Sequence, residues 1–546
     1  MAVYHPSKVR TPVRIRYPAF EKIMNSQKLK DKFPAVYRDF FSRCQKVVSA
    51  PHSFFWTGDF SGFYGGLTIL SKLPLRFYIG LEEIEKGSFE INPEIISYIP
   101  ANKKFSKARL DDYLIKELSY LMGEVLKGYK IHFLTEITLG TSLGGLGAMS
   151  SCLAKLTGKE KIFEAGWKIA RELQRGRTSG ATTFNAIYNS PYPIVFFSKG
   201  EKFWGKKLSD IFHLPAVPIW PIDFGLIFSG NLVQGAAVIA SAEEIKKDLE
   251  KKEKQIADAL KSDYENSFWQ TNLKMLNQIA NQNLIAFSEL FQKGTGDDTL
   301  EFFFNTLNQY QNMLHFWKIS TPQIDAVYSQ IHIISNKSEN NTGSGAKITG
   351  VGKGGEVLFV VPFGGYREKI EQQIKRLKYN IDYTSWDDGF EEKGLVLEQD
   401  ISTLKFAQFL PKGALLLKTY QKNHLSTLLC CEKDLALYAK KIDLLLDKTS
   451  GKIFLKGKKT NSSSLPSQKA TIEILNKLLV CQERLLKNTQ LPKSYAENRY
   501  DLQSKITIPL SRLTNLRFEI KGGMYENYSL SLKPFDIEIG IVEKVL

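Results

Sequence analysis

Cysteine and histidine are scarce in this chain of 546 residues, which has five cysteines and seven histidines. The cysteines are odd in number and widely scattered, so we expect no disulfide framework. No two histidines have the spacing of metal ligands, and Cys430-Cys431 has no second cluster to complete a zinc site. We therefore expect no structural metal. The N-terminus does not read as a signal peptide, so a reducing cytoplasm is the expected compartment.

A long apolar run is also missing. The most hydrophobic stretch, residues 214–230, is interrupted by Pro215, Pro218, Pro221 and Asp223. A membrane-spanning helix needs about 18 or more consecutive apolar residues. We therefore expect that the chain does not span a membrane.

Composition places the chain among globular proteins. It is 43% hydrophobic, 12% aromatic and 24% charged. These fractions exclude wholesale disorder, collagen and coiled coils, and the length predicts two or three folded domains.

Positive charge exceeds negative charge, with 74 Lys and Arg against 57 Asp and Glu and a formal net charge of +17. One interpretation is an anionic partner; the alternative is a generally basic composition with no nucleic-acid role. Residues 451–535 alone hold 15 Lys and Arg against 6 Asp and Glu, a net charge of +9. The excess is therefore concentrated near the C-terminus.

Hydrophobic periodicity predicts an α+β architecture. An N-terminal arm opens with basic residues and continues as a helix through Phe33, Val36, Phe40 and Phe41, which we expect to pack on the main domain. Antiparallel strands follow over 49–82. The remaining predicted elements are helices at about 109–128 and 159–175, strands at 130–137, 193–198, 223–229 and 356–361, and a largely helical tract over 240–335.

A glycine-rich loop, GGLG at 144–147, lies between a predicted strand and a predicted helix. Glycines let the backbone approach an anion, and the free amides of a helix N-terminus supply positive potential. The loop therefore suits a triphosphate, although a glycine-rich turn before a helix is by itself more often only a turn. It matches neither GxxxxGK[ST] nor a strict GxGxxG.

Three segments in a fixed order carry more weight. They are APHSFFWTGDFSGFYGG at 50–66, TSLGGLGAMSS at 141–151 and KITGVGKGG at 347–355. Together they resemble the three motifs of the GHMP kinases, the superfamily of galactokinase, homoserine kinase, mevalonate kinase and phosphomevalonate kinase. The resemblance covers roughly residues 46–398, and the third segment is its most specific part.

The resemblance implies a two-lobed fold: an N-terminal lobe of the ribosomal protein S5 domain 2-like type, then a ferredoxin-like α/β lobe. It implies transfer of a phosphoryl group from ATP, with Mg²⁺, to a hydroxyl or phosphate of a small metabolite. The glycines of the third segment would close the substrate and phosphate side of the cleft. The residues that the resemblance places at ATP are Gly144, Gly145, Gly147, Ser150, Ser151, Gly350, Gly352, Gly354 and Gly355.

Two magnesium ligands are implied by the same resemblance. Ser150 or Ser151 would lie near the metal, and Glu172, ten residues before Thr182, stands about where these kinases place a magnesium-binding glutamate. One residue fewer separates the two positions than in the superfamily pattern. The alternative for Glu172 is a solvent-facing helix carboxylate.

The chain also departs from the superfamily pattern. Ser53 replaces the lysine of the first motif, Asp59 replaces its glutamate, and Thr182 replaces the aspartate of the SGxD element. The two serines expected directly after GLG are Ala148 and Met149. The usual Asp and Lys pair is therefore absent.

Loss of that pair does not exclude the reaction class, because phosphoryl transfer passes through a loose transition state. A general base contributes about 10²–10⁴-fold, and homoserine-kinase-like members work without that aspartate. Arg175 and Arg177 lie close enough to Thr182 in the sequence to hold an anionic substrate, or they are surface residues. Glu172, Thr182 and Arg177 are the candidate catalytic residues.

The basic C-terminal segment has a strand at KIFLKGK, helices at about 467–480 and 492–515, and a candidate hairpin in which Gly522-Gly523 fits a tight turn. This order resembles the winged helix-turn-helix output domain of OmpR/PhoB-type response regulators. Pro509 is an objection to a straight recognition helix. The alternative is a basic accessory domain that packs on the kinase or binds another protein. The residues that the resemblance places at double-stranded DNA are Arg499, Lys505, Arg512 and Lys521.

Five units are expected: an N-terminal arm (1–45), two kinase lobes (46–220 and 221–398), a linker or packing segment (399–450) and a winged helix (451–535). The predicted protein is a GHMP-type small-molecule kinase fused to a DNA-binding domain. The alternative is a transcriptional regulator that senses a nucleotide or metabolite and has lost catalysis.

Overall fold

A computed structural model shows a mixed α+β architecture with four sheets, which confirms the predicted class. The residues it describes are 25–64, 66–176, 178–190, 193–197, 212–213, 222–232, 247, 251, 268–293, 297–336, 343–350, 352–362, 367–377, 379–384, 390–401, 415–421, 424–430, 435, 440–456, 458–460, 468–480, 485–496, 498–514, 516–521, 528–533, 535 and 537–544. Arg177 and the basic residues at the start of the N-terminal arm, within 1–24, lie outside these ranges.

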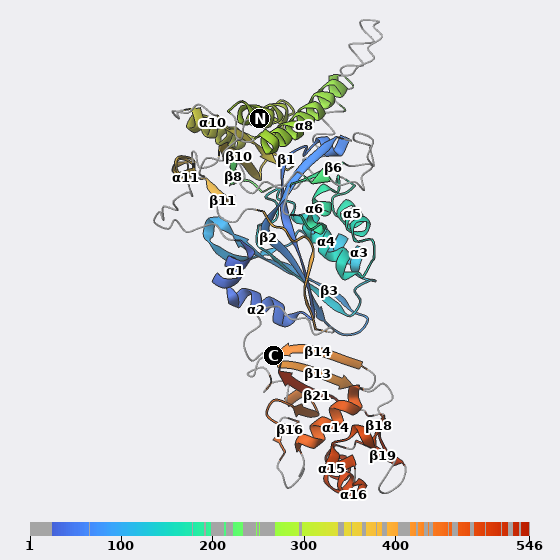
Figure 1. The fold of residues 1–546 in the computed structure, drawn as a ribbon. Helices are drawn as coiled ribbons and strands as arrows, with labels where there is room; N and C mark the ends of the chain where they lie inside the picture. The colour runs from blue at the N-terminus through green and yellow to red at the C-terminus, as the bar shows by residue number, and fades with distance from the viewer. Residues whose placement is uncertain are drawn as a thin grey trace, which may run out of the picture.

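Eight strands form the first sheet, in which the main path runs β12-β1-β2-β5-β3-β4 and β6 and β7 continue from β2 (Figure 1). β1 and β2 are long, antiparallel and buried along nearly their whole length, which confirms the strands predicted over 49–82. The eight strands are β1 (Lys46–Thr57), β2 (Leu67–Glu83), β3 (Phe89–Ile99), β4 (Lys104–Arg109), β5 (Tyr129–Thr135), β6 (Ile194–Phe197), β7 (Phe212–His213) and β12 (Val396–Asp400).

Helices cover both faces of this sheet (Figure 1). On one face, Leu153 of α4 packs in the same apolar cluster as Ile79 of β2. On the other face, Tyr37 of α2 packs near Tyr78, the neighbour of Ile79, because side chains alternate along a strand. The helices are α3 (Asp112–Met122), α4 (Gly145–Leu156), α5 (Ile162–Leu173) and α6 (Ala181–Ile187) on the first face, and α1 (Ser26–Lys32) and α2 (Pro34–Arg43) on the second. The predicted packing of the arm helix is thus confirmed.

The second sheet is four-stranded and antiparallel in the order β11-β8-β10-β9. It joins the first sheet through an aromatic core, where the rings of Phe54 and Phe224 stack 5.0 Å apart. Its strands are β8 (Ile222–Phe228), β9 (Gly345–Thr349), β10 (Glu356–Pro362) and β11 (Asn380–Thr384), and its helices are α8 (Phe268–Lys293), α9 (Asp297–Phe316), α10 (Pro322–Asn336) and α11 (Arg367–Arg376). In the described part of the chain, no helix is both long and apolar enough to cross a membrane.

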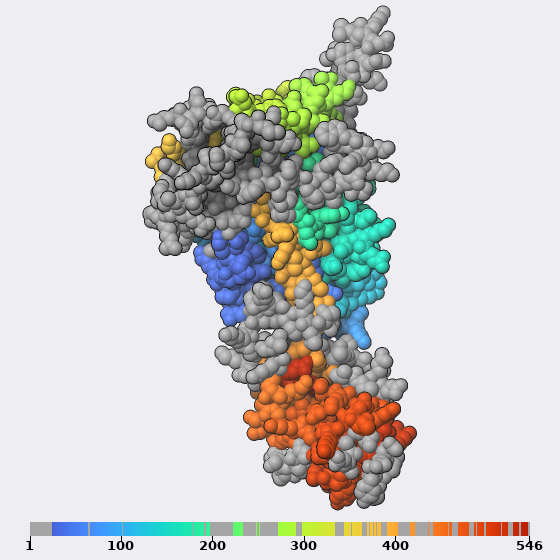
Figure 2. Space-filling view, viewed as in Figure 1, coloured from blue at the N-terminus to red at the C-terminus, as the bar shows by residue number. Residues whose placement is uncertain are grey.

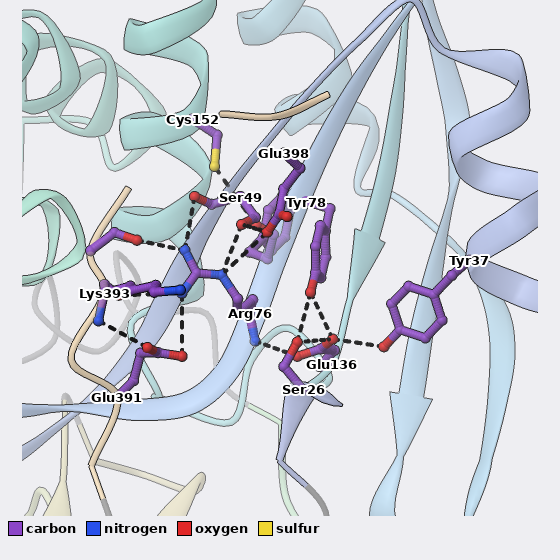
Figure 3. A network of polar contacts seen from close by, with 12 residues as sticks. Ser26, Tyr37, Ser49, Arg76, Tyr78, Glu136, Cys152, Glu391, Lys393 and Glu398 are labelled. Carbon is purple, nitrogen blue, oxygen red and sulfur yellow. Dashed lines mark hydrogen bonds and ion pairs between the residues drawn. The ribbon is translucent and has the colours of Figure 1, made fainter. Parts of the chain in front are cut away.

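Glu136, which follows β5, lies at the centre of a buried polar network (Figure 3). Its carboxylate accepts hydrogen bonds from the hydroxyls of Ser26, Tyr37 and Tyr78 at 2.7–2.9 Å and from the Arg76 amide at 2.6 Å. Burial raises the pKa of the Glu136 carboxyl, whereas these hydrogen bonds favour its ionised form. The network ties α1 and α2 to the first sheet.

The side chain of Arg76 continues the network toward the segment before β12 (Figure 3). Its guanidinium donates to the Ser49 hydroxyl at 2.8 Å and to the carbonyls of Lys393 and Gly394 at 3.2 and 2.5 Å. Carboxylates of Glu391 and Glu398 lie 3.4 and 3.8 Å away. A strand almost 350 residues from β1 in sequence is held beside it in this way.

The C-terminal part lies at the opposite end of the molecule from α8 and α10 (Figures 1 and 2). A six-stranded sheet, β14-β13-β21-β15-β16-β17, is followed by a three-stranded sheet, β18-β20-β19. The strands are β13 (Leu415–Gln421), β14 (His424–Cys430), β15 (Leu444–Asp447), β16 (Lys452–Leu455), β17 (Lys458–Lys459), β18 (Leu485–Lys487), β19 (Phe518–Lys521), β20 (Ser529–Leu532) and β21 (Ile539–Lys544), and the helices are α14 (Gln468–Val480), α15 (Lys493–Ala496), α16 (Arg499–Leu502) and α17 (Ile508–Thr514).

Two expectations for this part are refined. Residues 415–447 of the expected linker or packing segment form β13, β14 and β15, which belong to the same sheet as β16, and β21 closes that sheet beyond residue 535. The helical stretch at 492–515 contains a π-helical turn at 503–507, directly before Ile508 and Pro509, so the helix is not regular there. The hairpin of β19 and β20 is confirmed, and Gly522-Gly523 lies outside the described residues.

We expect Arg76→Met to lower the free energy of unfolding of the full chain by about 3–5 kcal/mol, because it leaves buried carboxylates and carbonyls without their cation. Chemical denaturation of wild type and variant measures this loss. Lys107→Met is the control, because its ion pair with Glu94 is largely exposed and its removal should cost about 0–1 kcal/mol. Equal midpoints for both variants would contradict a stabilising role of the network.

Candidate functional site

The three glycine-containing segments meet at one place in the structure. We call residues 58–66 the first loop, 139–144 the second loop and 350–355 the third loop. The amide of Ser53, ahead of the first loop, donates to Leu143 of the second loop at 3.0 Å. The amide of Glu356, which follows the third loop, donates to Thr141 at 3.2 Å. The second loop is therefore held from both sides.

A buried ion pair joins the first loop to β9. Lys347 Nζ lies 2.6 Å from Asp59 Oδ2, and both side chains are 0–1% exposed. Asp59 Oδ1 also accepts the Gly350 amide at 2.5 Å, so one carboxylate anchors the third loop as well. Burial raises the pKa of Asp59 and lowers that of Lys347, and the pairing opposes both shifts. Asp59 is thus committed to holding the loops together.

The second loop leads into the N-terminus of α4, the helix that carries the GGLG sequence. Gly144 is the N-cap residue and has φ +70°, a left-handed conformation that favours glycine. At Gly147 a Cβ would lie 2.4 Å from Thr182 Oγ1, so only glycine lets α6 approach this closely. Ser142, with φ +66°, has a buried hydroxyl with no hydrogen-bond partner in the described residues. Free amides and an unpaired hydroxyl fit a phosphate chain.

Ser53 and Thr182, the two departures from the kinase pattern, lie together under this loop. A Cβ on Gly144 would be 3.1 Å from Ser53 Cβ and 3.3 Å from Thr182 Cγ2. Asn185, which was not among the predicted site residues, donates from Nδ2 to Ser53 Oγ at 2.9 Å, and its buried Oδ1 accepts no hydrogen bond from the described residues. Asn185 lies three residues after Thr182 on α6, and this spacing places both side chains on one side of the helix, which could have identified Asn185 from the sequence.

His52 is neutral in this surrounding. Its Nδ1 and Nε2 lie 3.2 and 3.0 Å from Leu143 O and Thr135 Oγ1. Burial lowers the pKa of His52 to about 4. The ring is therefore neutral near pH 7 and supports the second loop through these contacts.

Ser150 and Ser151 are not placed as the sequence analysis expected. Both side chains are fully buried, and both hydroxyls donate to the Gly147 carbonyl, at 3.0 and 2.7 Å. Ser151 also donates to Thr183 O at 3.2 Å. The reason is helical geometry: they lie in the second turn of α4, where side chains turn toward α6 rather than toward the helix N-terminus.

Glu172 is likewise not directed at the loop. It is exposed on α5 and lines a depression beside Trp167. Arg175 stacks over the Tyr113 ring at 4.2 Å. In the described residues no group of three or more His, Cys, Asp or Glu side chains is arranged to hold a metal ion. The expected magnesium ligands, Ser150 and Glu172, do not fit that role here.

The third loop packs directly on the second. Cβ atoms at Gly350 and Gly355 would lie 2.6 and 2.7 Å from atoms of Ser142, and one at Gly352 would lie 2.2 Å from Ile319 Cγ2. The third loop can therefore approach the second only because these positions are glycine. Gly354, at φ +143°, completes the turn.

Glu356, the first residue of β10, lies beside Asp382 in the core. Glu356 is fully buried, and its carboxylate lies within hydrogen-bonding reach of that of Asp382. Burial, and then the Asp382 charge, raise the pKa of Glu356 well above its ordinary value, and burial raises that of Asp382 to about 7. No cation of the described residues contributes to either shift.

The four residues expected at DNA lie on the C-terminal part. Lys505 and Arg512 are exposed, on the turn before α17 and on α17 itself, and Lys505 pairs with Asp501 at 3.0 Å. Arg499 donates to the Ile520 carbonyl at 3.3 Å, which ties the α16 region to β19. Lys521 is exposed at the end of β19 and pairs with Glu519 at 3.6 Å.

No protein-family profile matches the chain, and no curated protein matches it. Solved structures do match. Methanococcus jannaschii mevalonate kinase is 14% identical over 62% of this chain and 97% of its own, with a TM-score of 0.39. Lactococcus lactis galactokinase, solved with galactose, is 13% identical over 68% of this chain and 99% of its own, with a TM-score of 0.44. Streptococcus pneumoniae phosphomevalonate kinase, solved with phosphomevalonate and AMPPNP, is 15% identical over 62% of this chain and 98% of its own, with a TM-score of 0.42. At such values this likeness decides nothing about the activity of the chain.

The raised pKa of Asp382 predicts a pH-dependent stability. Between about pH 4 and 7 the folded chain holds a proton that the unfolded chain releases, so the stability from this group falls as pH rises and is lost above about 7. The unfolding free energy of wild type relative to Asp382→Asn should therefore decline over this range, by at most about 1.4 kcal/mol per pH unit. Asp112→Asn, at an exposed carboxylate, should show no such decline. A constant difference between wild type and Asp382→Asn would contradict the shift.

Proposed function

We propose that the chain is an ATP-dependent small-molecule kinase that binds the phosphates of ATP at the N-terminus of α4. One observation carries this proposal: three loops from distant parts of the sequence converge at the amides that begin α4. Glycine is required by close packing at Gly147, Gly350 and Gly352. A helix N-terminus enclosed by such loops is suited to a phosphate chain.

In this proposal the residues act by positioning and neutral hydrogen bonding. ATP supplies the phosphoryl group that is transferred. The amides of Gly145 and Gly147 and the Ser142 hydroxyl hold phosphate oxygens, and the third loop excludes water from the same side. Thr182 presents its hydroxyl toward Gly147 and its methyl group toward Gly144, and the Ser53 hydroxyl accepts a hydrogen bond from Asn185. Because the transition state is loose, positioning and electrostatic stabilisation supply most of the acceleration.

Magnesium takes no part in the steps assigned to this chain. The two residues expected to bind it do not reach the loop, since Ser150 is turned into the α4–α6 contact and Glu172 faces outward. Thr182 remains the candidate at the loop from the catalytic set. Its role is a hydrogen bond to a phosphate oxygen or to the acceptor.

We further propose that the C-terminal part binds double-stranded DNA. Its supporting observations are the net charge of +9 over 451–535 and the exposure of Lys505 and Arg512 beside the short helix α17. Exposed Lys and Arg side chains contact DNA phosphates first and base edges second. In the hairpin of β19 and β20, Lys521 lies at the end next to the connection between the two strands, where it suits a contact with the DNA backbone.

A titration of the full chain with MgATP tests the kinase proposal. A rise in Tm and a calorimetric binding signal are expected for wild type, and ADP release on addition of hydroxylated or phosphorylated acceptors should follow. Gly144→Ala should weaken binding at least tenfold, because its Cβ crowds the loop against Ser53 and Thr182. Gly158→Ala is the matched control: Gly158 has the same φ of +70°, but its Cβ would meet nothing within 4 Å. Absence of MgATP binding by wild type would overturn the proposal.

A salt titration tests DNA binding. The full chain is used because a C-terminal fragment that begins at residue 445 would lack β13 and β14, which belong to the same sheet. Binding to a duplex should weaken steeply with salt concentration. Arg512→Ala should lower the slope of log K against log salt concentration by about 1. Lys107→Ala, an exposed change in the first sheet, should leave the slope unchanged. Salt-insensitive or absent binding would contradict this role.

A further inference from the structure

Three cations in the described part of the chain are buried: Lys72, Arg76 and Lys347. Arg76 is paired with Glu391 and Glu398, and Lys347 is paired with Asp59. Lys72 is 2% exposed, and its ammonium has one hydrogen bond, to the carbonyl of Tyr188 at 2.9 Å. No ion pair joins it to a carboxylate of the described residues. A buried charge is normally paired, so an unpaired ammonium needs an explanation.

The register of the first sheet places Lys72 beside the candidate phosphate site. On β1 and β2, Ser53 and Lys72 are directly opposite, so their side chains share one face of the sheet with Cβ atoms about 4.5–5.5 Å apart. That face is the one covered by α6, because Lys72 Nζ bonds to Tyr188 at the end of α6 and Ser53 Oγ bonds to Asn185 within it. Ser53 in turn lies against Gly144, the N-cap of α4.

Asn185 offers a second position for the ammonium. Its Oδ1 is an acceptor on a fully buried side chain and has no donor in the described residues. Asn185 lies one helical turn before Tyr188, on the way from the present partner of Lys72 toward Thr182 and Gly147. The lysine has a flexible four-carbon stem, so its ammonium can exchange the carbonyl for this amide oxygen and the neighbouring Ser53 hydroxyl.

The charge on Lys72 is poised to titrate. Burial lowers its pKa to about 8. Glu391 and Glu392, from the segment before β12, act in the opposite direction, and Arg76 on the same strand adds to the lowering. From β1 and α6 the groups that face it are neutral: Ser53, Asn185 and the Tyr188 carbonyl. The ammonium is therefore charged near pH 7 and loses its charge above about pH 8.

We propose that Lys72 is the cation of the phosphate site, and that its ammonium moves from Tyr188 O toward Ser53 and Asn185 Oδ1 to pair with an anionic phosphate held at the N-terminus of α4. This inference rests on the proposed function of the same site and adds the residue that neutralises the bound charge. In this proposal the Lys72 ammonium pairs with the phosphate charge of the ligand, as the Asp59 carboxylate pairs with the Lys347 ammonium.

The experiment measures MgATP affinity of the full chain by calorimetry between pH 7 and 9.5, where the phosphates of ATP no longer titrate. Wild type should lose about tenfold in affinity as pH rises through about 8, because a charge-assisted contact disappears. Lys72→Met should bind about tenfold more weakly at pH 7 and show no such pH dependence. Lys72→Arg keeps its charge at all these pH values, so it should retain affinity at pH 9.5.

Lys155→Met is the matched control, since Lys155 is exposed near the far end of α4, and it should bind as wild type does at every pH. Thermal melting of each variant checks that it folds. If Lys72→Met does not fold, the comparison of wild type with Lys72→Arg is the test. If wild type binds MgATP and Lys72→Arg shows the same affinity and the same pH dependence as wild type, the role of Lys72 is overturned and the ATP site stands. Absence of MgATP binding by wild type at every pH would overturn both proposals.

Discussion

The buried ion pair of Asp59 and Lys347 is the interaction on which the arrangement of the site depends. It connects residues 288 positions apart, with its two atoms 2.6 Å from each other and no exposure to solvent. Tyr310 supports it, because its hydroxyl accepts the amides of Phe60 and Ser61 and its ring lies 5.5 Å from the ammonium. Removing either charge would strand the other in the core. The first and third loops are therefore locked together before any ligand is considered.

Buried charges are also paired within the first sheet, on β2 and after β5. Arg76 and Glu136 are both buried and are satisfied by groups from four separate parts of the chain (Figure 3). These contacts hold α2 and the segment before β12 against β1 and β2. β1 and β2 carry Ser49 and Arg76 of this network and also Ser53 and Lys72 of the candidate site. The same contacts therefore fix the two strands that support the candidate site.

The groups beneath the second loop are unusual in being neutral. Ser53, Thr182 and Asn185 exchange hydrogen bonds or van der Waals contacts around Gly144, and His52 is held uncharged. Among the described residues, these groups include no side chain suited to remove a proton from an acceptor. In the kinase function that we propose, positioning and charge neutralisation supply the acceleration, which a loose transition state allows. In that proposal the α4 amides and Lys72 neutralise most of the phosphate charge.

The amino-acid sequence by itself determined the α+β class, most of the described helices, strands such as β1, β2, β5, β8 and β10, and the three segments of the candidate site, because these depend on local periodicity and on where glycine is required. It did not determine the roles of Ser150, Ser151 and Glu172, since the direction of a helical side chain is decided by the neighbour against which the helix packs. Strands at 415–447 were missed because a sheet closed by β21 is a long-range pairing. Only the tertiary structure placed Lys72 opposite Ser53, because a register irregularity between Pro51 and Ser53 sets which residues of β2 face it.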